Sequence, residues 1–235
     1  MQKPSLNSSW ARSAVDIRTS ALGVIFDMDG VLVDSSAAHF EAFKAMGLKV
    51  GSEFTWEFFQ RIFGLHNDEI FPLWLGPLSR AEVLALAREK EALYRKLAPE
   101  FVRPIPGVLD LIDALAVAGF RLAVGSSGPR ENVEMAQDIL GRREVFATTV
   151  SGDDVKHGKP APDIFLRAAR ELALEASQCL VIEDALAGIA AALAAQMRVV
   201  AIATSLPLAK LSDATFAVQE MRELSPDVIR KILIK

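Results

Sequence analysis

Four acidic residues occur in two short motifs, and each motif follows an apolar segment. Asp27 and Asp29 lie in FDMDG, and Glu183 and Asp184 end the run CLVIED. Carboxylates in such positions can ligate a metal, act as a nucleophile or exchange protons with a substrate. If they share a small volume, they repel one another unless a cation lies between them. Because carboxylate oxygens without paired His or Cys suit Mg²⁺, the motifs favour a magnesium site.

Two further polar segments have groups that suit an anion. Ser126, Ser127 and Gly128 follow the apolar run FRLAVG, where a hydroxyl and backbone N–H groups can hold a phosphate oxygen. Lys159 precedes Pro160 in HGKPAPDIF, and a lysine on a stiff backbone can neutralise phosphate charge. Taken singly, such a serine loop is more often a helix cap, and such a lysine a solvated group. The recurrence of polar clusters after apolar runs is what indicates a site.

Hydrophobic periodicity predicts the elements that must position these residues. From residue 107 onward, short apolar strands alternate with helices, which indicates a parallel sheet covered on both faces. Residues 22–26 form a further strand, so the polar clusters fall at strand ends or shortly after one, at the edge where such folds bind ligands. Between about residues 34 and 104 the pattern is almost entirely helical. The predicted fold class is α/β: a Rossmann-like parallel sheet core with a small all-helical cap domain inserted after the first strand.

The same pattern predicts the domain boundaries. Residues 21–34 and 105–235 are assigned to the catalytic core, residues 35–104 to the helical cap, and residues 1–20 to a flexible leader. Residues 79–98 begin with a serine N-cap and are expected to form one cap helix, with prolines 99, 104 and 106 ending the helices. A set of cap aromatics at helical spacing is expected to form a core rather than line a substrate pocket. The set is Phe54, Trp56, Phe58, Phe59, Phe63, Phe71 and Trp74.

Composition excludes several classes of protein. The chain has 235 residues, of which 51% are hydrophobic and 24% charged, as is typical of a globular protein. The net charge is −4 with both signs interleaved, so no nucleic-acid partner is expected. No apolar stretch is long enough to span a bilayer, so no membrane partner is expected, and the default location is cytoplasmic. The single cysteine, Cys179, is expected to be a buried core residue.

In chain order, the segments FDMDGVLVDS, VGSSG, GKPAPDIF and VIEDALAGI resemble the four motifs of the haloacid dehalogenase (HAD) superfamily. The resemblance runs from about residue 22 to the C-terminus. It is to the branch with a helical cap inserted after the first strand, which includes β-phosphoglucomutase and phosphoglycolate phosphatase. Within this superfamily, the second aspartate of the motif, Asp29, implies phosphoryl transfer. The haloacid dehalogenases themselves lack this aspartate and need no metal. The phosphonoacetaldehyde hydrolases also depart from the D-x-D pattern.

The resemblance implies a role for each motif residue. Asp27 would attack phosphorus and form an aspartyl-phosphate. Asp29 would act as general acid to the leaving oxygen and then as general base for water. Ser126 and Lys159 would bind the transferring phosphoryl group, with Ser127 beside them. The implied Mg²⁺ ligands are Asp27, the backbone carbonyl of Asp29, Glu183 and Asp184.

The cap decides whether the phosphoryl group goes to water or to a second sugar hydroxyl. His39 falls where the mutases of this family carry a histidine near the hinge. The segment FGLHNDEI resembles the cap substrate loop, so Gly64 and Asn67, together with His39, are expected to bind substrate. In this loop a phenylalanine precedes Gly64, and Asn67 follows it by three residues. β-Phosphoglucomutase has a lysine and an arginine at those places, and a bisphosphorylated intermediate needs charge at both ends, so a phosphatase is favoured. Arg61, His66, Lys90 or Arg95 could compensate for the missing charge, but each is expected to be a surface group.

The predicted function is thus Mg²⁺-dependent hydrolysis of a small phosphorylated metabolite by a phosphoric monoester hydrolase. Phosphoglycolate, sugar phosphates and nucleotide phosphates all fit the motifs. Two alternatives stay open: a β-phosphoglucomutase-like sugar phosphate mutase, and a non-catalytic phosphometabolite-binding module on the same fold. A monomer or weak homo-oligomer is expected.

Overall fold

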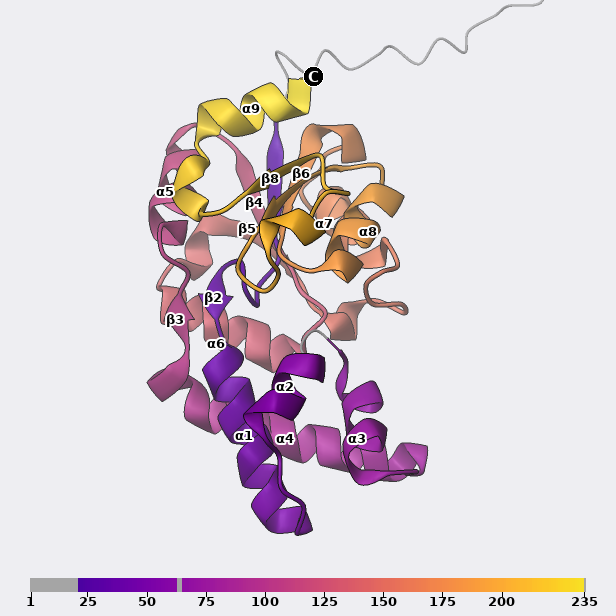
Figure 1. Ribbon diagram of the computed structural model, residues 1–235. Helices are drawn as coiled ribbons and strands as arrows, with labels where there is room; N and C mark the ends of the chain where they lie inside the picture. The colour runs from indigo at the N-terminus through magenta and orange to yellow at the C-terminus, as the bar shows by residue number, and fades with distance from the viewer. Residues whose placement is uncertain (1–20, 63–64, 235) are drawn as a thin grey trace, which may run out of the picture.

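A computed structural model describes residues 21–62 and 65–234, and a six-stranded parallel sheet forms its centre (Figure 1). The strands at the middle of the sheet are short buried apolar segments. Phe26 of β1 lies beside Val124 of β4 and Ile182 of β6, so the residues that follow these strands meet at one edge. In spatial order the strands are β5 (Phe146–Val150), β4 (Arg121–Gly125), β1 (Gly23–Phe26), β6 (Cys179–Glu183), β7 (Arg198–Ile202) and β8 (Phe216–Val218).

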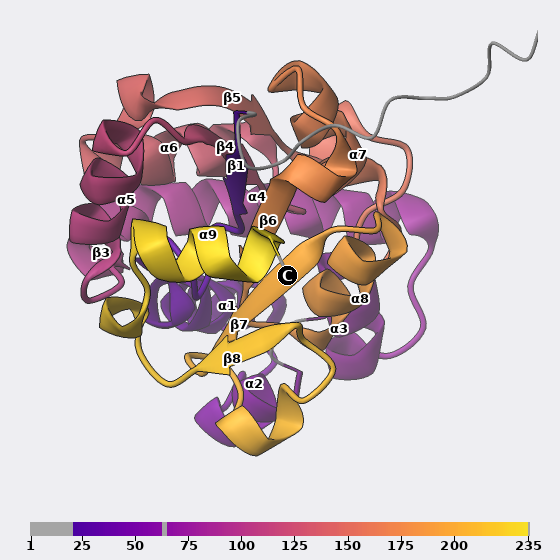
Figure 2. The same ribbon diagram turned by 90° about the horizontal axis from the view of Figure 1, so that it is seen from above.

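Helices cover both faces of the sheet (Figure 2). Successive residues of β1 alternate between two buried clusters, with Val24 and Phe26 in one and Ile25 in the other, as the pleat of a strand requires. The first cluster includes residues of α5 (Val108–Val117), α6 (Arg130–Leu140) and α9 (Pro226–Ile234), and the second includes residues of α7 (Asp163–Glu171) and α8 (Leu186–Ala194). The α/β fold class predicted from the sequence is confirmed.

The helical insertion lies between two short strands that pair with each other. β2 (Val33–Asp34) and β3 (Arg103–Pro104) run antiparallel. The helices between them lie beyond the carboxyl edge of the sheet (Figure 1) and are α1 (Ser36–Val50), α2 (Trp56–Ile62), α3 (Asn67–Leu75) and α4 (Arg80–Phe101). They enclose a separate aromatic core that includes Phe43, Phe54, Phe59 and Phe71, so most of the predicted aromatic set is core, although Trp56 is 44% exposed. Phe63 lies outside the described residues.

Pro99 does not end the last cap helix, contrary to the sequence-based expectation. α4 begins after Ser79, whose Oγ accepts a hydrogen bond from the backbone N–H of Glu82 at 3.3 Å, but it continues through Pro99 to Phe101. A proline in the last turn removes only one backbone hydrogen bond, and burial of Ala98 and Val102 holds this end of the helix in place. The predicted leader, residues 1–20, lies outside the described residues.

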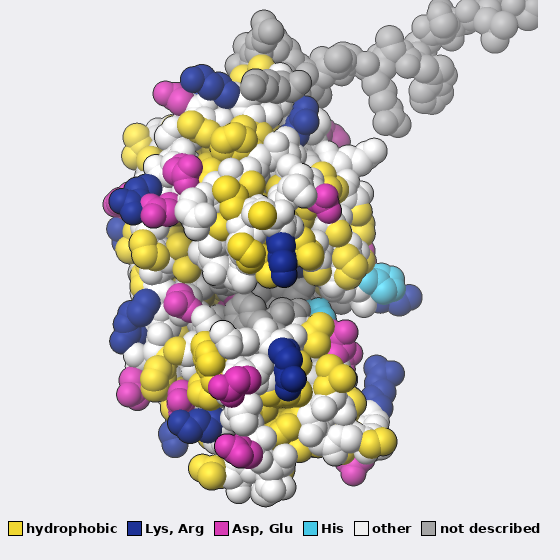
Figure 3. All heavy atoms as spheres, in the orientation of Figure 1, with side chains coloured by type: hydrophobic (Ala, Val, Ile, Leu, Met, Phe, Trp, Pro, Cys, Tyr) yellow, Lys and Arg dark blue, Asp and Glu magenta, His cyan; other side chains and the backbone are white. Residues whose placement is uncertain are grey.

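The remaining expectations from composition concern the surface and the cysteine. Figure 3 shows positive and negative side chains interspersed over the face drawn, as the interleaved sequence predicts. Cys179 is buried, as predicted, and burial raises the pKa of its thiol to about 12. Within residues 21–62 and 65–234 no single helix has the length and apolarity to cross a membrane; α3 and α4 meet that criterion only when counted together, and a bend of 107° separates them.

Candidate active site

The centre of the candidate site is Asp27, the first residue beyond β1. Its backbone N–H donates to the carbonyl of Ile182 at 3.0 Å, which fixes it against the end of β6. The Lys159 ammonium donates to the Asp27 carboxylate and, at 2.7 Å, to Oε1 of Glu183. Burial alone lowers the pKa of Lys159, but the charges of Asp27 and Glu183 raise it above its ordinary value. The lysine is therefore a fixed positive charge within the site, although it lies 132 residues from Asp27 in sequence.

Asp27, Glu183 and Asp184 form a buried acidic cluster in which one oxygen from each residue lies within 4.8 Å of the others. Burial and the negative charge of Glu183 raise the pKa of Asp27 to about 7, although Lys159 opposes the shift. Burial and the same neighbouring carboxylates raise the pKa of Asp184 well above its ordinary value. A single ammonium thus leaves the cluster short of positive charge. Three carboxylates at this spacing fit a hard divalent cation such as Mg²⁺.

Two glycines make room for these carboxylates. A Cβ on Gly30 would lie 1.9 Å from Oδ2 of Asp184, and the residue has a φ of +78°, which disfavours other side chains. A Cβ on Gly188 would lie 1.7 Å from Oε1 of Glu183. Glycine is therefore required at these positions of FDMDG and VIEDALAGI, because a larger side chain would collide with a carboxylate of the cluster.

Glu183 and Asp184 are oriented by different partners. Glu183 accepts hydrogen bonds at 2.8 Å from the backbone N–H groups of Asp184 and Ala185, in addition to the one from Lys159. Asp184 accepts hydrogen bonds from the hydroxyl of Ser205 and, at 3.3 Å, from that of Thr204. Neither hydroxyl was identified from the sequence, although both follow the apolar run MRVVAIA as the other site residues follow their strands.

Asp29 points away from the acidic cluster towards the cap. Its carboxylate accepts a hydrogen bond from the Ser35 hydroxyl, and Oδ1 lies 3.8 Å from Nε2 of His39. Lys90 donates to Nδ1 of His39 at 2.7 Å, so the ring proton is assigned to Nε2, facing Asp29. Burial and the charge of Lys90 lower the pKa of His39, which is therefore neutral near pH 7. Burial raises the pKa of Asp29, but His39, the Ser35 hydroxyl and the charge of Lys90 together lower it by more, so this carboxyl titrates below its ordinary range.

Lys90 is not a surface group, and that expectation was wrong. It is 2% exposed, because its ammonium bonds Glu91 at 2.9 Å as well as His39 and lies 4.8 Å from the centre of the Phe43 ring. Tyr94 stacks on the His39 ring at a centroid distance of 4.0 Å. The Lys90 ammonium also lies 5.5 Å from the centre of the Tyr94 ring. The ion pair with Glu91 and the faces of Phe43 and Tyr94 replace the water that a lysine ordinarily requires.

Glu91 is the centre of a polar contact between the cap and the core. Its carboxylate accepts hydrogen bonds from Asn67 of α3 at 2.7 Å and from Asn132 of α6 at 2.6 Å, besides the one from Lys90. Asn67 was predicted as a substrate-binding residue, and its side-chain amide is directed to Glu91. The favourable partners outweigh the burial of Glu91 and lower its pKa to about 2.

Replacing Glu91 by Gln should lower the free energy of unfolding at pH 7 by on the order of 3 kcal/mol, because a shift of the pKa from 4.5 to about 2 has that worth. Since the folded-state pKa is depressed, this stabilisation is present above about pH 5 and is lost as the pH falls towards 2. The difference between wild type and variant in urea unfolding should shrink over that range. Glu89→Gln, on the exposed face of the same helix, is the control, and equal effects of the two variants would contradict the prediction.

The serine loop lies on the other side of Asp27, after β4. The backbone N–H of Ser126 donates to the carbonyl of Val150 at 3.0 Å, and its hydroxyl accepts from the backbone N–H of Gly128 at 3.0 Å. Ser126 is 2% exposed. The Ser127 hydroxyl is buried and has no hydrogen-bond partner among the described residues. Gly64, predicted with His39 and Asn67 as a substrate-binding residue of the cap, lies outside the described residues.

The fold and this site define an α/β enzyme whose chemistry lies at the carboxyl edge of a parallel sheet, below a helical cap. Residues 24–202 match the family described as haloacid dehalogenase-like hydrolase. The chain belongs to this family.

Individual relatives and solved structures agree. The chain is 35% identical over 212 residues to the protein SUPPRESSOR OF QUENCHING 1, chloroplastic, of Arabidopsis thaliana, covering 87% of this chain and 20% of that protein. It is 34% identical over 189 residues to the fructose-1-phosphate phosphatase YqaB of Escherichia coli (strain K12), covering 74% of this chain and 93% of that one. The structure of β-phosphoglucomutase from Clostridium difficile aligns with a TM-score of 0.79 and 26% identity, covering 91% of this chain and 97% of that one.

These comparisons confirm the superfamily and branch predicted from the sequence, and they confirm the enzyme class, a phosphoric monoester hydrolase. The chain spans only a fifth of SUPPRESSOR OF QUENCHING 1 but nearly all of the bacterial phosphatase. The substrate and the roles of individual residues are matters of proposal.

Proposed function

We propose that this protein is a Mg²⁺-dependent phosphatase that hydrolyses a small phosphorylated metabolite through a phosphoryl group carried transiently by Asp27. One observation carries the proposal: Asp27 lies beside both a fixed ammonium, Lys159, and two further carboxylates, Glu183 and Asp184. A carboxylate placed among charges of both signs can attack an anionic phosphorus centre, because the cations offset the repulsion between the two anions.

The residues divide the chemistry among themselves. Asp27 attacks phosphorus, while Lys159 and the Ser126 loop hold the transferring oxygens. Asp29, steadied by Ser35 and His39, gives a proton to the leaving oxygen and later takes one from water. An anionic substrate next to Asp29 raises the pKa of that carboxyl, which favours the protonated form that the first step needs. General acid–base catalysis of this kind contributes about 10²–10⁴-fold.

The acidic cluster fits Mg²⁺. Asp27, Glu183 and Asp184, with the backbone carbonyl of Asp29, would hold it. When bound, Mg²⁺ supplies positive charge to the phosphoryl oxygens and keeps the carboxylates ionised. Ser205 and Thr204 hold the Asp184 carboxylate in place by hydrogen bonds.

The proposed domain division follows the paired strands β2 and β3. Residues 21–34 and 105–235 would form the catalytic core, and residues 35–104 a cap that selects the substrate. The sugar phosphatase among the relatives supports a phosphorylated sugar or a similar polyol as the substrate class.

The test is a panel of phosphorylated metabolites together with an aryl phosphate, assayed by phosphate release with Mg²⁺ and with EDTA. Turnover of at least one ester should fall by on the order of 10²-fold or more in EDTA and return when Mg²⁺ is restored. Equal turnover in EDTA would refute the metal requirement. A folded protein that binds phosphate esters without turning over any of them would be the non-catalytic module instead.

A sugar phosphate mutase is the second candidate, favoured by His39 and by the structural likeness to β-phosphoglucomutase. Formation of glucose 6-phosphate from β-glucose 1-phosphate without free phosphate would establish it. Lys90 and Arg95 do not supply the missing cap charge, because Glu91 neutralises the first and Glu131 pairs with the second at 2.8 Å. Phosphate release is therefore the expected outcome.

A further inference from the structure

Two separate segments must reach the same phosphoryl group if the proposed function holds. One is the loop of Ser126, Ser127 and Gly128 after β4, and the other is the segment after β5 that carries Lys159. Their backbones touch where the backbone N–H of Gly152 donates to the carbonyl of Gly128 at 2.9 Å. A Cβ on Gly152 would lie 2.3 Å from the carbonyl oxygen of Ser127, so this approach requires glycine. The relative position of the two segments is thus closely constrained at this point.

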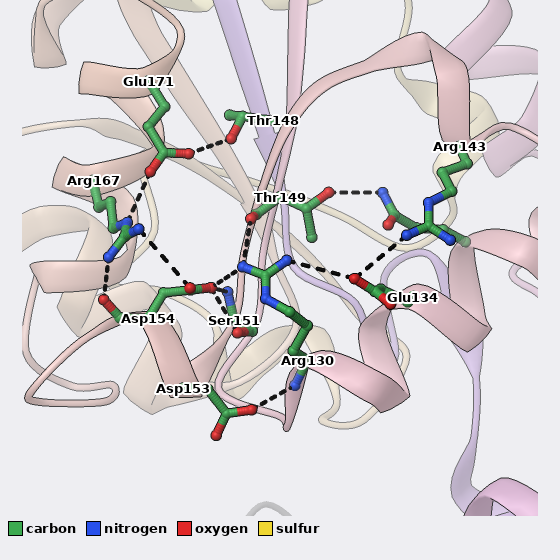
Figure 4. A network of polar contacts seen from close by, with 11 residues as sticks. Arg130, Glu134, Arg143, Thr148, Thr149, Ser151, Asp153, Asp154, Arg167 and Glu171 are labelled. Carbon is green, nitrogen blue, oxygen red and sulfur yellow. Dashed lines mark hydrogen bonds and ion pairs between the residues drawn. The ribbon is translucent and has the colours of Figure 1, made fainter.

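Arg130 extends this contact with charged groups (Figure 4). It is the first residue of α6 and is separated from the serine loop only by Pro129. Its backbone N–H donates to Asp153 at 2.8 Å, and its guanidinium donates to the Asp154 carboxylate. The same guanidinium lies 3.4 Å from the carbonyl of Thr149 on β5. The start of α6 is therefore tied to the short helical turn Gly152–Asp154.

Asp154 is also bound from its other sides. Its Oδ2 accepts hydrogen bonds from the backbone N–H of Ser151 at 2.8 Å and from the Ser151 hydroxyl at 2.7 Å. Arg167 of α7 donates to the backbone carbonyl of Asp154, and Nη2 of this arginine lies 3.9 Å from the carboxylate. Arg167 is held in turn by Glu171 at 2.8 Å (Figure 4). Asp154 therefore contacts α6, which follows the serine loop, and α7, which follows Lys159.

The ionised form of Asp154 is the one these contacts select. Its side chain is 16% exposed. Burial opposes ionisation, but the hydrogen bonds from Ser151 and the charge of Arg130 lower the pKa of Asp154 below its ordinary value. The carboxylate touches none of the groups to which chemistry is assigned.

We propose that Asp154 is a positioning residue: its carboxylate, through Arg130, Ser151 and Arg167, holds the Ser126–Gly128 loop and the Lys159 segment at the separation at which both bind one phosphoryl group. The inference rests on the proposed function for its phosphoryl ligand. A displacement of about 1 Å between catalytic groups can cost 10²-fold in rate, so loss of the Asp154 contacts should lower both phosphate affinity and turnover.

The test is Asp154→Asn, which keeps the shape of the side chain but removes the charge and turns one acceptor into a donor. With Mg²⁺ present, the affinity for inorganic phosphate should fall about 10-fold and kcat/KM by about 10–100-fold. The affinity for Mg²⁺ should stay near wild type, because the acidic cluster is untouched. The melting temperature should fall, because the amide loses the partners that lower the pKa of Asp154. Arg130→Gln should act in the same direction. The double variant should lose little more than either single variant, because both changes break the same contact.

Asp113→Asn is the matched control, since Asp113 forms an exposed bidentate pair with Arg142, at 2.8 and 3.0 Å, that joins neither segment. It should leave phosphate affinity and turnover unchanged. Unaltered phosphate affinity in folded Asp154→Asn, or strict additivity with Arg130→Gln, would overturn the inference. If Asp154→Asn does not fold, folded Arg130→Gln decides in the same way. Phosphate affinity needs no turnover, so an inactive wild type refutes the phosphatase while this measurement still decides the role of Asp154.

Discussion

Replacing Asp27 by Asn should lower turnover of an aryl phosphate by on the order of 10⁴-fold or more while the protein stays folded. The amide has nearly the shape of the carboxylate but is a poor nucleophile and a weak metal ligand. Stability should be retained, because burial and the charge of Glu183 already raise the pKa of Asp27 to about 7, so its ionised form is costly in the protein without a metal. Activity is measured as phosphate release, and the fold by circular dichroism and the melting temperature.

Asp34→Asn is a suitable control for Asp27→Asn. Asp34 is an exposed aspartate of the following strand, β2, and it contacts Ser36 rather than the acidic cluster. It should keep wild-type turnover within about twofold, because surface substitutions usually have small effects. A folded Asp27→Asn protein with undiminished, Mg²⁺-dependent turnover would remove Asp27 from the chemistry and with it the proposed mechanism.

Replacing Lys159 by Met should lower turnover by on the order of 10³-fold, because the site loses its fixed positive charge beside the transferring phosphoryl group. The affinity for phosphate should fall with turnover. The affinity for Mg²⁺ should hold or rise, because the acidic cluster then lacks its competing ammonium. Calorimetric titration of each ligand separates these effects, and a common loss of both affinities would contradict the assignment.

Lys156→Met is the control for Lys159, since Lys156 is exposed on the same loop. Loss of Lys159 leaves buried carboxylates uncompensated and can cost about 3–5 kcal/mol in stability. Lys159→Arg keeps the charge but not the compact ammonium, so it should stay folded and recover only part of the turnover. Full recovery by arginine would mean that charge alone suffices and that the position of the ammonium is unimportant.

The sheet and the inner part of the site were predictable for one reason. Apolar runs such as CLVIED and FRLAVG are short and end in polar groups, and parallel strands bring those ends to one edge. The sequence therefore predicts that Asp27, Ser126 and Asp184 meet at this edge of the sheet. Lys159 was identified from its proline-rich surroundings and from the family resemblance. Its contacts with Asp27 and Glu183 join residues that are distant in the sequence, so hydrophobic periodicity does not reveal them.

The contact between cap and core could not be predicted from hydrophobic pattern alone. Lys90 and Glu91 lie on the same buried stripe of α4 as Val83, Tyr94 and Ala98, where apolar residues are expected. A charged pair within such an apolar stripe indicates that the pair is buried and bonded to polar partners. The partners themselves, Asn67 and Asn132, come from helices on either side of α4, and only tertiary packing brings them together. The Asp154 contacts escape sequence reasoning for the same reason.

The ladder between β2 and β3 has a consequence for how this enzyme can change. Val33 stands opposite Pro104 and Asp34 opposite Arg103, so the chain enters and leaves the helical insertion at nearly the same point. The two ends of the insertion are therefore adjacent. A tight turn of a few residues could replace the whole insertion without stretching the backbone. The insertion can therefore be exchanged as one piece, by recombination in evolution or by grafting in the laboratory, provided that the replacement again supplies groups such as Ser35 and His39 against Asp29.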